Sequence, residues 1–109
     1  MRLIIVTMIA VLSLAFAQSS QKEGNGGGEQ IFQEQCAGCH GPDGKAQTEM
    51  GKNLQAADLT SANVQQADDS QLSKSIADGK GKMPAFQDKL EERQIRTVVA
   101  YVRKLGKKQ

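Results

Sequence analysis

The run Cys36-Ala37-Gly38-Cys39-His40 constrains this chain more than any other feature of its sequence. A C-x-x-C-H run is the attachment motif of c-type haem. Each thiol can form a thioether with one vinyl group of the same porphyrin, and the histidine that follows can offer a neutral imidazole nitrogen to the iron. These are the only two cysteines and the only histidine in the chain. The run therefore predicts one covalently attached haem c, bound through Cys36 and Cys39, with His40 as an axial iron ligand.

Three other uses of the two thiols are weaker explanations of the same run. A disulfide between them would close a very small loop and would remove little entropy from the unfolded chain. A thioredoxin-like C-x-x-C lies beside a βαβ pattern, which this sequence lacks. A zinc site needs four nitrogen or sulfur ligands, or three with a water. Three ligands taken from a single turn would crowd the metal ion.

The N-terminus has the pattern of a secretory signal peptide. A basic start, Met1-Arg2, precedes an apolar stretch over residues 3–14 and the A-x-A site Ala15-Phe16-Ala17. The apolar stretch is shorter than the roughly 20 residues that cross a bilayer. We therefore expect residues 1–17 to be cleaved, the mature chain to be periplasmic and to have no membrane span. A retained N-terminal anchor is the alternative.

The remainder of the chain predicts one small domain. Residues 18–28 are polar and rich in glycine, which is typical of a flexible lead-in, and residues 29–109 form the domain. The chain has three phenylalanines, one tyrosine and no tryptophan, so a haem would supply an apolar body that the side chains do not. A net charge of +2 without a basic stripe and interleaved aromatics gives no case for nucleic-acid binding.

Helical periodicity dominates, and no segment alternates with the period of a strand. We predict short helices over 29–36 and over 69–78, the second capped by Asp69, and a short turn over 60–64 capped by Thr60. Residues 41–58 contain several glycines and a proline and are predicted to form a loop. The longest helix is the last, with a start near Asp88 and an end at Gly106. Its apolar face comprises Ile95, Val98, Val99, Val102 and Leu105. The fold class is therefore all-α.

A second axial ligand is expected from a methionine, because His40 fills only one of the two axial positions. Met83 lies in a loop where Pro84 stiffens the backbone and neighbouring glycines allow close approach to a flat ligand. Histidine with methionine is the ligand pair of cytochromes c. Met50 competes, but it lies only ten residues after His40. Packing in the core is the alternative role for Met83.

On these motifs the chain resembles the class I cytochromes c of the small bacterial monohaem kind, the cytochrome c6 and c551 types. The attachment run, the Met83-Pro84 loop and the terminal helix over 94–102 carry the resemblance. It implies a cytochrome c fold of three to four short helices wrapped around one haem. It also implies that the first and last helices pack together through four residues, Gly28, Phe32, Val98 and Tyr101.

The resemblance further implies that Leu54 and Leu59 line the haem pocket. In the family, a proline in the segment after the attachment turn often provides the carbonyl that accepts the N–H of the axial histidine. Here that segment, residues 51–54, contains no proline. We expect a backbone carbonyl of the same loop to accept the bond.

The predicted function is that of an exported one-electron carrier with low-spin iron, monomeric and not an enzyme. Its partners are redox proteins, whose identity as donor and acceptor the sequence does not specify. A haem subunit of a larger dehydrogenase or oxidase complex is one alternative. A haem enzyme or gas sensor with a labile Met83 is another. Four lysines could steer an acidic partner to the haem edge or could be ordinary solvated charges, namely Lys45, Lys52, Lys80 and Lys82.

Overall fold

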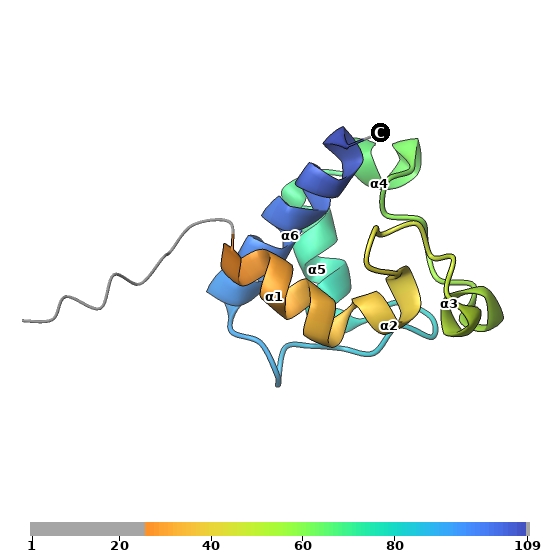
Figure 1. The fold of residues 1–109 in the computed structure, drawn as a ribbon. Coiled ribbons are helices and arrows are strands. Elements are labelled where there is room, and N and C mark those ends of the chain that lie inside the picture. The colour runs from red at the N-terminus through yellow and green to blue at the C-terminus, as the bar shows by residue number, and fades with distance from the viewer. Residues whose placement is uncertain (1–25, 109) are drawn as a thin grey trace, which may run out of the picture.

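The computed structural model describes residues 26–108, so the predicted signal peptide and residues 18–25 of the predicted lead-in lie outside the described residues. Within this part of the chain, the regular elements are helices, apart from an isolated bridge between Lys80 and Met83 (Figure 1). In chain order the helices are α1 (Gly26–Gln35), α2 (Ala37–His40), α3 (Glu49–Leu54), α4 (Ala62–Gln66), α5 (Asp69–Asp78) and α6 (Glu92–Lys107). The all-α prediction is confirmed. The expected count of three to four helices omitted the short α2 and α3, and α1 begins three residues before the predicted start.

Helix α6 is the centre of the fold, because its apolar face supplies most of the core. Glu91 caps its start through a capping box with Gln94, three residues after the predicted start at Asp88. The predicted stop at Gly106 is also wrong, since the helix continues to Lys107. A Cβ atom at Gly106 would overlap the side chain of Gln65, so this glycine allows close packing and does not end the helix. The buried side chains of α6 are Ile95, Val98, Val99, Tyr101, Val102 and Leu105.

Helix α1 packs across α6 and fixes the direction in which the chain enters the C-x-x-C-H run (Figure 1). The side chain of Phe32 is 0% exposed, and its ring lies 5.3 Å from that of Tyr101 with a tilt of 55°. Gly28 is buried, and a Cβ atom there would overlap the carbonyl oxygen of Thr97. Val98 is 1% exposed. The predicted contact between the first and last helices is confirmed.

One arginine of α6 bonds to both α4 and α5. The guanidinium of Arg103 donates to the carbonyl of Gln65 at 2.8 Å and to the carboxylate of Asp69 at 2.9 Å. The bonds join the end of α4 and the start of α5 to α6. Capping at both helices differs by one residue from the prediction: Asp68 and not Asp69 caps α5, and Ser61 and not Thr60 is the N-cap position of α4.

Helix α3 lies inside residues 41–58, which were predicted to be loop, so that prediction is wrong for Glu49–Leu54. Thr48 caps it, and its hydroxyl accepts the backbone N–H of Gly51 at 2.9 Å. Gly51 is one of the glycines that favoured a loop over residues 41–58. It is buried, and a Cβ atom there would overlap the carbonyl oxygen of Cys39. The glycine therefore serves packing between α3 and the end of α2.

None of the helices within residues 26–108 combines the length and the apolar character that crossing a bilayer requires.

Replacing Gly28 with alanine is expected to lower the free energy of unfolding by about 1–3 kcal/mol, because the added methyl group forces α1 away from α6. Gly27 is the matched control, since nothing lies within 4 Å of a Cβ atom at that position. Gly27→Ala should leave stability unchanged or slightly raised. Denaturant unfolding of the purified proteins measures both. Equal losses in the two variants would contradict close α1–α6 packing at Gly28.

Candidate functional site

A cavity of about 680 Å³ opens beside α2, and all four predicted site residues line it. Cys36, Cys39 and His40 form one wall, and Met83 lies in the wall contributed by the loop between α5 and α6. The attachment run and the loop that carries Met83, which are far apart in the sequence, thus line the same cavity. The remaining lining residues are Gln35, Leu54, Gln55, Ala56, Ala57, Lys80, Gly81, Lys82, Pro84 and Phe86.

The C-x-x-C-H run forms a single helical turn. The carbonyl of Cys36 accepts the backbone N–H of Cys39 at 3.3 Å and that of His40 at 2.9 Å. Both thiols are free and half-buried. Burial, and to a smaller extent the charge of Cys39, raises the pKa of the Cys36 thiol to about 11. Among residues 26–108, no three His, Cys, Asp or Glu side chains converge on a single metal ion. Two thiols and an imidazole therefore face the same cavity.

The imidazole of His40 is oriented by a backbone carbonyl. Its Nδ1 lies 2.9 Å from the carbonyl oxygen of Ala57. Because a carbonyl can only accept, Nδ1 carries a proton, and the neutral form of the ring therefore has its lone pair on Nε2. A hydrogen bond of this kind fixes the ring and raises its basicity as a metal ligand. The acceptor is a backbone carbonyl of the loop after the attachment turn, as expected, and Ala57 is the residue that provides it.

Met83 is held by a tight hairpin. Lys80 and Met83 exchange both backbone hydrogen bonds, Lys80 N–H to Met83 oxygen at 3.1 Å and Met83 N–H to Lys80 oxygen at 2.9 Å. Gly81, with φ of 58°, occupies the turn between them. The loop is also tied to α5, because Phe86 donates to the carbonyl of Ile76 at 3.0 Å. The half-buried Met83 is thereby fixed at the cavity wall.

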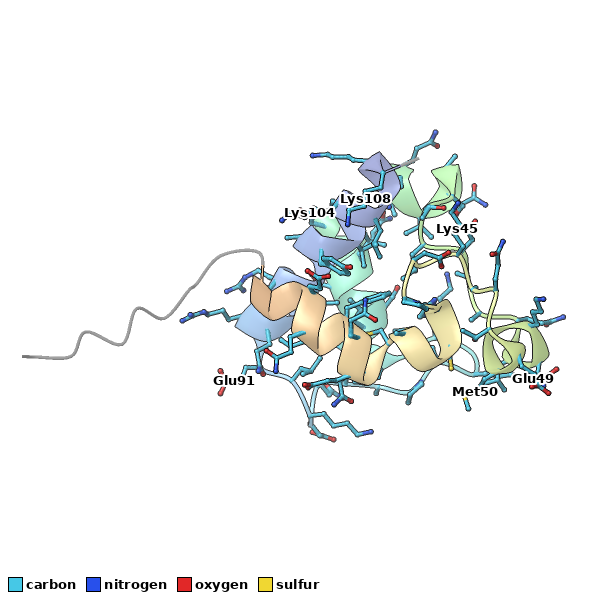
Figure 2. The ribbon with its side chains drawn as sticks, viewed as in Figure 1. Lys45, Glu49, Met50, Glu91, Lys104 and Lys108 are labelled. Carbon is cyan, nitrogen blue, oxygen red and sulfur yellow. The ribbon has the colours of Figure 1, made fainter. Side chains whose placement is uncertain are left out.

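Met50 does not reach this cavity. It lies on α3 with 56% of its surface exposed (Figure 2), and it is not among the residues that line the space. Of the two leucines implied by the resemblance, Leu54 lines the cavity and is 37% exposed there. Leu59 does not line the cavity, because its side chain packs against the core.

Two residues that contribute to the site were not predicted from the sequence. Phe86 is buried and lines the cavity. An aromatic three residues after Met83 in an aromatic-poor chain was the available signal. The carbonyl of Ala57 had no signal, because any residue carries one.

The four lysines separate into two groups. Lys80 and Lys82 line the cavity, whereas Lys45 and Lys52 do not. Lys45 lies in the loop between α2 and α3 (Figure 2). Its neighbour Gly44 would contact Leu105 if it carried a Cβ atom.

Comparison with known proteins gives a family and several relatives. Residues 25–102 match the family described as cytochrome C oxidase, cbb3-type, subunit III. A cytochrome c6-like protein of Nostoc sp. is 33% identical over 102 residues, which cover 94% of this chain and 88% of the relative. The cytochrome c6 of the same organism is 35% identical over 99 residues, covering 91% and 85%.

Two further similarities differ in how much of the other protein they cover. The cbb3-type cytochrome c oxidase subunit FixP of Bradyrhizobium diazoefficiens is 38% identical over 81 residues, 72% of this chain but only 27% of that subunit. Among solved structures, the KustC0563 c-type cytochrome superposes with a TM-score of 0.66 at 29% identity. That superposition covers 72% of this chain and 95% of the other.

Gly79→Ala tests how the loop holds Met83. Gly79 has φ of 78° and ψ of 168°, a conformation that is nearly exclusive to glycine, and an added Cβ atom would lie 2.7 Å from the carbonyl oxygen of Met83. We expect a loss of about 2–3 kcal/mol in the free energy of unfolding. Gly81→Ala is the control with positive φ but open space around it, and should cost about 1 kcal/mol. A Gly79 variant no less stable than the Gly81 variant would contradict the role of this contact.

Proposed function

The chain belongs to the class I monohaem c-type cytochromes, and we propose that it is an exported carrier of single electrons whose one haem c is attached through Cys36 and Cys39 and ligated by His40 and Met83. It is a cytochrome c6-like electron carrier and not an enzyme. One observation above all supports the proposed ligation: two thiols, one imidazole and one thioether, from segments far apart in the sequence, line the same cavity.

The residues of the cavity fit a haem. A volume of about 680 Å³ lies within the range of sites for cofactor-sized ligands, roughly 300–1,000 Å³. The half-exposed Leu54 and the ring of Phe86 offer apolar surface to a flat apolar group. The two thiols suit thioether attachment, and His40 has its Nδ1 proton already engaged, which leaves Nε2 for a metal ion. The donor set is that of a His/Met haem site.

When bound, a haem supplies a one-electron couple between ferric and ferrous iron. His40 from α2 and Met83 from the hairpin would hold the iron and occupy the positions at which it could otherwise bind a further ligand. Filled positions leave no site for a substrate, which suits electron transfer without bond chemistry. A methionine ligand raises the reduction potential of such a site. The apolar wall works in the same direction, because burial disfavours the additional charge of the oxidised form.

The share of each relative that the chain matches supports an independent carrier over a subunit of an oxidase. The chain matches 88% and 85% of the length of the two cytochrome c6-type relatives, but 27% of the FixP subunit. Export to the periplasm, where we propose that the mature protein works as a monomer, rests on the signal-peptide pattern of residues 1–17.

We propose that the redox partner binds this protein through an acidic surface of its own. Lys80 and Lys82 line the cavity, and no Asp or Glu is among its lining residues in the described part of the chain. Two cations at the opening create a local positive potential, which attracts an acidic donor or acceptor and raises the rate of encounter. Redox encounters of this kind use small, short-lived interfaces.

The ligand assignment is tested by Met83→Ala, with Met50→Ala as the control. The oxidised Met83 variant should lose the long-wavelength methionine–iron charge-transfer band, and its reduced form should bind carbon monoxide, because one axial position is then open. The Met50 variant should keep the band and exclude carbon monoxide. Absorption spectra of the purified holo-proteins give both readouts. Loss of the band in the Met50 variant alone would overturn the assignment, and rapid binding of carbon monoxide by the unaltered protein would favour a gas-binding role.

Steering by the two lysines is tested with hexacyanoferrate(III), an anionic one-electron oxidant. Oxidation of the reduced protein should slow as salt rises. The double variant Lys80→Glu/Lys82→Glu should react at least about tenfold more slowly at low salt, with a weaker dependence on salt. The charge-matched control Lys107→Glu/Lys108→Glu alters α6 and the residue that follows it and should have a smaller effect. Equal effects of the two double variants, measured by stopped flow, would show that only net charge matters.

A further inference from the structure

The segment that carries the Ala57 carbonyl needs a restraint other than proline. Residues 51–57 contain no proline, and the three residues after α3 have no regular structure. Nevertheless the carbonyl oxygen of Ala57 lies 2.9 Å from Nδ1 of His40. A bond of this length requires the segment to be fixed relative to α2, and the structure has two features that fix it.

The first feature is the hydroxyl of Thr48. It accepts the N–H of Gly51 at 2.9 Å, and its own proton lies between two acceptors, the carbonyl of Gly38 at 2.9 Å and that of Cys39 at 3.2 Å. These carbonyls belong to the end of α2, where helical partners are lacking. One hydroxyl therefore joins the end of the haem-attachment turn to the start of α3. A helix of four residues is not stable alone, so this link also holds the turn.

The second feature is the backbone of Gly51. A side chain there would overlap the carbonyl of Cys39, so α3 lies directly against the attachment turn. The carbonyl of Gly51 accepts the N–H of Ala56 at 2.8 Å. Ala56 precedes Ala57, whose carbonyl accepts the imidazole of His40. A closed series of contacts therefore runs from the end of the attachment turn to Thr48, from Thr48 to Gly51 and the segment up to Ala57, and from Ala57 back to His40 in the same turn.

We propose that Thr48 is a positioning residue of the iron site, which acts through Gly51 and Ala56 to hold the Ala57 carbonyl on the imidazole of His40. The proposal rests on axial ligation by His40. A well-placed acceptor gives the imidazole more negative character, and a more basic ligand stabilises ferric iron. Removing the hydroxyl lets the Ala57 carbonyl move away, weakens the bond at Nδ1 and raises the reduction potential.

The test uses the holo-proteins of Thr48→Val, which keeps the shape and removes the hydroxyl, and of Thr48→Ser, which keeps the hydroxyl. Thr97→Val is the matched control, because the Thr97 hydroxyl donates to the Arg93 carbonyl within α6, away from the cavity. At a fixed ambient potential, Thr48→Val should raise the ratio of reduced to oxidised protein at least threefold. That change corresponds to about 28 mV, since tenfold is 59 mV for one electron. The other two variants should match the unaltered protein.

Hydrogen exchange gives a second readout that a purely structural cap would not change. In the reduced protein, exchange of the His40 Nδ1 proton, followed by NMR, should be at least tenfold faster in Thr48→Val than in Thr48→Ser. If Thr48→Val loses stability as Thr97→Val does but leaves potential and exchange unchanged, Thr48 only caps α3 and the proposal is overturned.

A measurement on the unaltered protein covers the case in which Thr48→Val does not fold. Under rising denaturant, the Gly51 and Ala56 amide protons and the His40 Nδ1 proton should exchange through one common opening. If the His40 proton stays protected while the two amides exchange freely, the proposal is overturned. An unaltered protein without a low-spin haem spectrum contradicts the proposed function itself. A low-spin protein with an unresponsive Thr48→Val contradicts the positioning role alone.

Discussion

The packing of α1 against α6 is the contact on which the rest of the structure depends. It places the end of α1 at the edge of the core, and the next residue, Cys36, begins the attachment turn. The contact works because Gly28 allows the two helices to approach closely and because Phe32 and Tyr101 fill the space beside them. A chain with so few aromatic side chains uses two of them at this crossing. A third, Phe86, stands at the wall of the cavity.

From this crossing the two walls of the cavity follow by separate routes. The attachment turn continues α1, and the hairpin that carries Met83 is tied to α5 by the bond from Phe86 to Ile76. Helix α5 is in turn joined to α6 through Arg103 and Asp69. The positions of His40 and Met83 are therefore both fixed relative to the same helix, α6, although neither residue lies on it. Such an arrangement suits an iron site that changes its charge without changing its ligands.

The sequence predicted the parts of this architecture that depend on side-chain chemistry or on long periodic patterns. The C-x-x-C-H run, Met83, the apolar face of α6 and the glycine–aromatic pairing with α1 all carry such signals. Helix α3 was missed because Gly51 has low helix propensity, and the contact with the Cys39 carbonyl that requires a glycine is tertiary. The sequence predicted that a carbonyl of the loop after the attachment turn accepts the His40 bond, but it did not identify Ala57, because backbone carbonyls are alike and only the path of the chain selects one. The stop at Gly106 failed for a related reason, since its glycine serves packing against Gln65.

The central claim is that Met83, and not Met50, ligates the iron opposite His40. Proton NMR of the reduced holo-protein tests it directly, because a methyl group held over a porphyrin face is shifted far upfield by the ring current. The account predicts one such resonance, assigned to the Met83 S-methyl group, with the Met50 methyl group at an ordinary position. An upfield methyl resonance assigned to Met50, or none at all, would contradict it.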